Sequence, residues 1–129
     1  MHKVFVYGTL KSGGGLRGLD TISPESMIVG RAKTTYPDFE MLDLGAFPGV
    51  IDGEKYIQGE VWEVDENTFD VLDRIEGYPT FYNRKLIPTT QGKAWMYYLK
   101  DHENYSDCAK STESDSIETV SETLIWSNR

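Results

Sequence analysis

The feature that most restricts the fold of this chain is a series of short strand-forming segments separated by glycine and proline. The first, 4–7, reads Val-Phe-Val-Tyr and is typical of a buried strand, because all four residues favour the extended state. Segments 82–90 and 93–99 predict a hairpin. Weaker strand candidates lie at 27–34, 39–44 and 49–52, and the stretch 56–64 reads as a strand with alternating faces. Many short strands with one clear helix predict an α+β chain, built as a small β-barrel with helical additions.

The clear helix is predicted at 66–76. Asp65 precedes it and is a favourable N-cap, because its carboxylate can accept hydrogen bonds from the free amides of the first turn. Gly77 is suited to ending the helix, and Pro79 prevents its continuation.

The composition changes after Lys100. Residues 101–116 are rich in Ser, Thr, Asp and Glu, which predicts a solvated loop or a mobile segment. We therefore expect a barrel domain over 1–100 and an acidic polar extension over 101–129 that packs on that domain or trails from it.

The last part of this extension carries a weak helical pattern. Ile117, Val120 and Leu124 recur at helical spacing, which predicts the apolar stripe of a short helix docked on the barrel. Ile125 and Trp126 are predicted to form a final anchor.

The charge and cysteine content restrict the class of protein. The 129 residues carry a net charge of −8, which disfavours phosphate backbones and anionic membranes as partners. The single cysteine, Cys108, excludes an internal disulfide framework and fits a reducing compartment. No signal-peptide core is visible, and no apolar run approaches the roughly 20 residues that span a bilayer. We expect a single-domain cytoplasmic protein, a monomer or a weak homodimer, with neither a nucleic-acid nor a membrane partner.

Glu76 is the first candidate site residue. On a helical projection it falls inside the apolar arc that contains Phe69, Leu72 and Ile75. Burial disfavours the carboxylate, and so does the negative end of the helix dipole, so both predict a raised pKa suited to a general base or acid. A carboxylate that frays into solvent or caps a loop is the alternative. The other charged residues of the second and third turns fall outside the arc: Asp70, Asp73 and Arg74.

The second candidate is the turn Tyr7-Gly8-Thr9-Leu10, where the first strand ends. Glycine at this point permits unusual backbone angles and lets a ligand approach the main chain closely. Successive amides in such a turn can hold an anion. An ordinary exit from the strand remains the alternative.

Other motifs carry little weight. Gly13, Gly15 and Gly18 match the spacing G-x-G-x-x-G, but the first glycine lies well past the strand and Pro24 disrupts a following helix. A flexible loop is the better interpretation. His2, His102 and Cys108 show no metal-ligand spacing, and no G-x-S-x-G elbow for a hydrolase is present.

Taken in order, four segments resemble the gamma-glutamylcyclotransferase-like family, including its gamma-glutamylamine cyclotransferase branch. They are VFVYGTLKSG at 4–13, LGAFPGVI at 44–51, GEVWEVDENTFDVLDRIEGYPTFYNR at 59–84 and AWMYYL at 94–99. The third is the most specific, since it joins an aromatic-containing strand, a helix ending Leu-Asp-x-x-Glu-Gly, and Tyr-x-Arg.

The resemblance implies a small, mixed but mostly antiparallel barrel with a pocket at one end. It implies that Tyr7, Gly8, Thr9 and Leu10 hold a gamma-glutamyl group, that Glu76 is catalytic, and that Tyr82 lines the pocket. The implied reaction is cyclisation of a small-molecule gamma-glutamyl substrate to 5-oxoproline with release of an amine, a step that needs neither a metal nor a cofactor.

Three other functions remain open at this stage. The same fold can bind a small carboxylate without turnover, although a buried glutamate would not help it to do so. The glycine loop can bind a nucleotide, and the acidic extension can serve as an interaction surface. The substrate is equally open among gamma-glutamyl amino acids, gamma-glutamyl-lysine products and other gamma-glutamyl amines.

Overall fold

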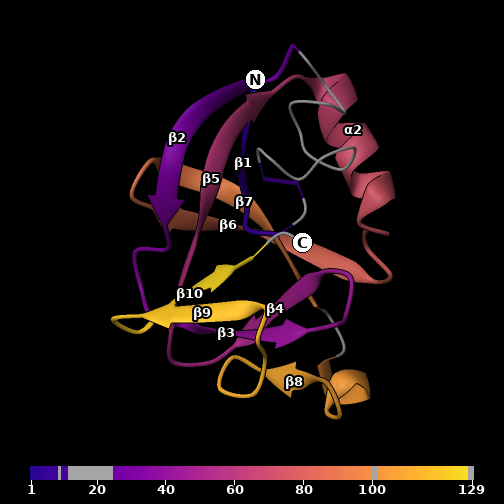
Figure 1. The fold of residues 1–129 in the computed structure, drawn as a ribbon. Coiled ribbons are helices and arrows are strands. Elements are labelled where there is room, and N and C mark those ends of the chain that lie inside the picture. The colour runs from indigo at the N-terminus through magenta and orange to yellow at the C-terminus, as the bar shows by residue number, and fades with distance from the viewer. Residues whose placement is uncertain (9, 12–24, 100–101, 128–129) are drawn as a thin grey trace.

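The computed structural model describes the whole chain except residues 9, 12–24, 100–101 and 128–129. Its larger sheet has seven strands and its smaller sheet has three. The strands of the larger sheet are β1 (His2–Val6), β2 (Met27–Lys33), β5 (Tyr56–Val64), β6 (Tyr82–Thr89), β7 (Gly92–Leu99), β9 (Ile117–Val120) and β10 (Thr123–Trp126). Their order is β6-β7-β1-β5-β10-β9, with β2 paired to β5. The sheet curls into a half-barrel (Figure 1), and the predicted α+β, mostly antiparallel architecture is confirmed.

The first strand lies in the middle of the larger sheet. β1 pairs antiparallel with β5 and parallel with β7, so that Val4 lies opposite both Trp62 and Trp95. Alternate residues of β1 enter two different apolar clusters. Because side chains alternate across a strand, both faces of β1 are buried from Val4 to Val6, which explains why these three residues are all apolar. The predicted hairpin is also confirmed, as β6 and β7 pair antiparallel along their full length.

Helix α2 (Glu66–Ile75) packs against the larger sheet through Phe69 and Leu72. The Asp65 side chain accepts a 2.7 Å hydrogen bond from the Thr68 amide, as predicted for the N-cap. The helix ends where Gly77 adopts a left-handed conformation with a φ of 63°. Two proposed boundaries of the helix, Asp65 and Gly77, are therefore confirmed.

The smaller sheet contains β3 (Phe39–Asp43), β4 (Pro48–Asp52) and β8 (Ala109–Lys110), in the order β4-β3-β8. Figure 1 shows it at the opposite end of the molecule from the start of α2. The segment predicted as a solvated loop thus contributes a paired strand, β8, preceded by a short 3-10 helix η2 (His102–Tyr105). That prediction was wrong for this part of the segment, because a strand of two residues leaves almost no compositional pattern.

The predicted C-terminal helix is also wrong, since β9 and β10 form an antiparallel hairpin. The helical spacing was coincidental: Ile117 and Leu124 are buried on the hairpin, whereas Val120 is half exposed. Trp126 is buried, as the anchor prediction required. β10 pairs in parallel with β5 at Leu124 and Ile57, so the hairpin extends the larger sheet. No helix among the described residues is long and apolar enough to cross a bilayer.

Candidate active site

A cavity of about 470 Å³ opens where β1, β4, β6, β7 and the end of α2 converge. Its walls are mainly apolar and aromatic, a composition typical of small-molecule sites. The described residues that line it are Phe5, Val6, Tyr7, Gly8, Leu10, Phe47, Pro48, Ile75, Glu76, Phe81, Tyr82 and Tyr97.

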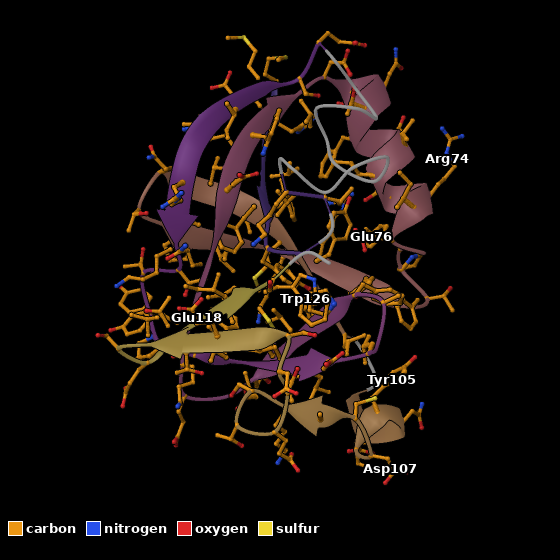
Figure 2. All side chains as sticks on the ribbon, viewed as in Figure 1. Arg74, Glu76, Tyr105, Asp107, Glu118 and Trp126 are labelled. Atoms are coloured by element: carbon orange, nitrogen blue, oxygen red, sulfur yellow. The ribbon has the colours of Figure 1, made fainter. Side chains whose placement is uncertain are left out.

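Glu76 reaches this cavity because it terminates α2. Its amide donates to the carbonyl of Leu72, and its carbonyl accepts from the amide of Tyr82, which ties the end of the helix to the start of β6. Figure 2 shows Glu76 on the side of the helix end that faces the sheet, whereas Arg74 extends away from the molecule. Ile75 falls at the pocket and is 51% exposed, so the apolar arc of the helix continues into the cavity rather than into the core.

The Glu76 carboxyl group has no hydrogen-bond or ion-pair partner within the described part of the chain. Burial raises the pKa of this carboxyl from 4.5 to about 7. The upward direction agrees with the prediction, with burial as the cause. A carboxyl group with this pKa can both accept and return a proton near neutral pH.

The Tyr7 hydroxyl joins two strands beside the cavity. It donates a 2.8 Å hydrogen bond to the carbonyl of Tyr97 and accepts one of 3.3 Å from the amide of Val50. Burial, followed by the negative charge of Glu76, raises the pKa of Tyr7 well above its ordinary value. Its hydroxyl is therefore fixed in place as a neutral group.

Gly8 owes its identity to a close contact. A Cβ atom at this position would lie 2.8 Å from Cγ and Cδ of the Pro48 ring, which is closer than real Cβ contacts come. Gly8 does not have a positive φ, so the turn makes no use of the unusual backbone angles that glycine permits. The turn closes through a 3.1 Å hydrogen bond from the Lys11 amide to the Gly8 carbonyl. Thr9 lies outside the described residues.

Two further tyrosines complete the polar part of the cavity. The Tyr82 hydroxyl donates a 2.6 Å hydrogen bond to the carbonyl of Pro48. The Tyr97 hydroxyl donates one of 2.6 Å to Oδ1 of Asp73. Burial raises the pKa of both tyrosines, and the negative charge of Glu76 adds to the increase in each.

Asp73 belongs to a hydrogen-bond network that joins α2 to β6 and β7. The predicted outward position of this residue is wrong: its side chain is only 19% exposed and pairs with Arg84, with Nε and Oδ1 2.9 Å apart. The guanidinium group lies over the rings of Phe69, Tyr78 and Trp95. Asp73 points to β6 and β7 because this stacked cation compensates its charge, an effect that a helical projection does not include.

The structure thus gathers Tyr7, Gly8, Leu10, Glu76 and Tyr82 around one cavity. Sequence reasoning missed Pro48 and Tyr97 as members of the site, although both fall within segments quoted for the resemblance. The alternation of β7 was the available signal for Tyr97, because it places this tyrosine on the same face as Leu99. The loop with Gly13, Gly15 and Gly18 lies outside the described residues. Among the residues that are described, no three His, Cys, Asp or Glu side chains gather as a metal site.

The fold is similar to that of a solved structure. The crystal structure of an AIG2-like protein from Mus musculus matches with a TM-score of 0.72 and 23% sequence identity, over 90% of this chain and 89% of that one. At this level of identity the match concerns the fold.

Sequence comparison then gives the family. Two relatives carry the name "Putative gamma-glutamylcyclotransferase". The relative from Vibrio cholerae is 41% identical over 81% of this chain and 89% of its own length. The relative from Methanocaldococcus jannaschii is 35% identical over 78% of this chain and 87% of its own length. The family model described as "Gamma-glutamyl cyclotransferase, AIG2-like" matches residues 4–118. The chain belongs to this family.

Proposed function

We propose that the protein cyclises a gamma-glutamyl compound to 5-oxoproline and releases a free amine, with Glu76 as the proton-transfer group. The observation that carries this proposal is the Glu76 carboxyl group, which has no partner among the described residues and a pKa of about 7, in the same cavity as Gly8 and Leu10. An anion-binding pocket without turnover would gain nothing from a buried carboxylate beside its ligand.

The first step is deprotonation of the substrate. The alpha-amino group is protonated near neutral pH and cannot attack until it loses a proton. The Glu76 carboxylate accepts that proton, and the neutral amine then attacks the gamma-carbonyl carbon of the same molecule. Because the nucleophile is tethered, holding the chain in a folded conformation supplies much of the rate enhancement.

The second step is collapse of the tetrahedral intermediate. Glu76 donates its proton to the leaving nitrogen, the bond from carbon to that nitrogen breaks, and the amine departs. The new ring nitrogen gives its extra proton to the regenerated carboxylate, from which the released amine takes it. We assign the binding of the alpha-carboxylate or the oxyanion to backbone amides of the Gly8–Leu10 turn, since Gly8 and Leu10 line the same cavity as Glu76.

The substrate class is tested with a panel of one gamma-glutamyl amino acid, gamma-glutamyl-epsilon-lysine and one gamma-glutamyl alkylamine. We expect at least one to yield 5-oxoproline and its free amine in equal amounts, measured by liquid chromatography with mass detection. A folded protein that binds these compounds without releasing 5-oxoproline would be a binding module, and the proposal would be wrong.

A further inference from the structure

Three tyrosines line the cavity that contains Glu76, and the hydroxyl group of each already donates its proton in a hydrogen bond. Tyr7 donates to the carbonyl of Tyr97, Tyr82 donates to the carbonyl of Pro48, and Tyr97 donates to Asp73. A hydroxyl group has one proton to donate and two lone pairs with which to accept. What these groups can offer a ligand is therefore acceptor capacity alone.

The direction of these hydrogen bonds follows from the partners. A backbone carbonyl only accepts, so Tyr7 and Tyr82 must be the donors. Asp73 pairs with the Arg84 guanidinium through two contacts, of 2.9 and 3.3 Å. In the third bond Tyr97 is the donor and Oδ1 of Asp73 is the acceptor.

The oxygens of Tyr82 and Tyr97 are the two with capacity left. The Tyr7 oxygen already accepts from the Val50 amide, whereas no described group donates to the other two. All three tyrosines line the same cavity as Glu76, and its negative charge raises the pKa of each tyrosine. The residues around this cavity therefore include a carboxylate and two hydroxyl oxygens with acceptor capacity left.

We propose that the Tyr82 and Tyr97 hydroxyl oxygens, together with the Glu76 carboxylate, form a binding site for a primary ammonium group. An ammonium group has three N–H donors and no acceptor, which matches three acceptors whose own protons point elsewhere. The identification of this group as the alpha-ammonium of a gamma-glutamyl substrate rests on the proposed function. It orients the substrate with its ammonium group at the end of α2 and its carboxylate at the Gly8–Leu10 turn. Tyr82 and Tyr97 thereby hold the ammonium group so that the proton that Glu76 removes lies next to the Glu76 carboxylate.

The test compares two ligands that differ by one amino group and cannot cyclise: L-2-aminopentanoate and pentanoate. Both are titrated by NMR at pH 8, where Glu76 is ionised, into the native protein, Tyr82→Phe, Tyr97→Phe and the control Tyr36→Phe, whose side chain is exposed. We expect the native protein and Tyr36→Phe to prefer the amino acid at least tenfold. Tyr82→Phe and Tyr97→Phe should each lose threefold or more of this preference, with pentanoate affinity unchanged.

An unchanged preference in both variants would overturn the ammonium site. Tyr82→Phe leaves the network of Asp73 intact, so it decides the question if Tyr97→Phe does not fold. Turnover of the active gamma-glutamyl compound separates this inference from the proposed function. If the tyrosine variants lose preference for the amino acid but no compound yields 5-oxoproline, the ammonium site stands and the proposed enzyme activity is refuted. If 5-oxoproline is released but the preference is unchanged in the variants, the enzyme activity stands and the ammonium site is refuted.

Discussion

Arg84 and Asp73 form a two-point contact in which Nε lies 2.9 Å from Oδ1 and Nη2 lies 3.3 Å from Oδ2. The contact links the third turn of α2 to β6, one helical turn before Glu76. Because Tyr97 donates to the same carboxylate, Asp73 connects the end of α2 both to β6 and to the tyrosine of β7 that lines the cavity.

We expect Arg84→Met to lower the free energy of unfolding by about 2–4 kcal/mol, because it leaves the largely buried Asp73 without its cation. Arg84→Lys should restore part of this loss, as a point charge cannot reproduce the planar contact or the ring stacking. Denaturant unfolding measures both. The matched control is Lys85→Met on the same strand. The ion pair of Lys85 with Asp52 is exposed and 3.9 Å long, so this substitution should lower the free energy of unfolding by less than about 1 kcal/mol. Equal effects at the two positions would contradict this role for Arg84.

Glu76→Gln should abolish 5-oxoproline release, because an amide cannot accept the proton of the substrate. It should also change how stability depends on pH. The raised pKa of Glu76 means that its stabilising contribution is complete below about pH 4.5 and is lost as the pH rises through about 7. The free energy of unfolding of the glutamine variant, measured relative to that of the native protein, should therefore rise by up to about 3 kcal/mol between pH 4 and pH 8. A pH-independent difference in unfolding free energy would show that Glu76 is not buried as described.

The acid limb of the rate profile should report the same group. Glu76 must be ionised to act as a base, so kcat/KM should rise tenfold per pH unit below about 7 and level off above it, until the substrate amine itself titrates. Steady-state rates between pH 5 and 9 with the best substrate of the panel provide the measurement. An acid limb centred near pH 4.5 would indicate an unperturbed carboxyl group and argue against this assignment.

Gly8→Ala should reduce kcat/KM at least tenfold, because the added Cβ atom meets the Pro48 ring and displaces the turn from the cavity. Pro48→Ala removes the two ring atoms, Cγ and Cδ, that cause the close contact, but it keeps the carbonyl that accepts the hydrogen bond from the Tyr82 hydroxyl. In a double-mutant cycle, the pair should lose less activity than the sum of the single variants. Simple additivity would show that the close contact is not the cause.

The hairpin of β9 and β10 turns through Ser121 and Glu122, whose φ angles are 49° and 62°. Two residues with positive φ are typical of a type I′ turn, in which Asn-Gly is preferred. Changing the pair to Asn-Gly should raise the free energy of unfolding by about 1 kcal/mol by removing left-handed strain. Thermal unfolding measures this gain. As a control, Glu118→Gly, within β9, should lower it by about 0.5–1 kcal/mol.

Much of the fold could be predicted, because at many positions the local sequence favours the same element that the tertiary structure contains. The apolar run of β1, the N-cap Asp65 and the end of the helix at Gly77 each have a local cause. The C-terminal hairpin could not be predicted in this way. Ser-Glu is a poor sequence for its turn, and the segment becomes a strand through pairing with β5, which lies more than sixty positions earlier in the chain.

In the candidate site too, positions with a local cause could be predicted and positions that depend on distant residues could not. Helical phase was enough to direct Glu76 inward, because the position of a side chain on a helix follows from its number. Asp73 was misplaced by the same method, since its burial depends on Arg84 from another strand. Pro48 and Tyr97 are brought to the cavity by strand pairing; the alternation of β7 indicates which face Tyr97 lies on, but not that this face meets Pro48.

The central position of β1 has a consequence for how the chain is made. Its partners are synthesised much later: Val4 pairs with Trp62 and then with Trp95. A nascent chain on the ribosome therefore carries a first strand with an unpaired apolar segment, Val4 to Val6, until most of the protein has emerged. Contacts so distant in sequence form slowly, and exposed apolar strands aggregate readily. We expect the efficiency of folding in the cell to depend on whether this strand is protected during synthesis.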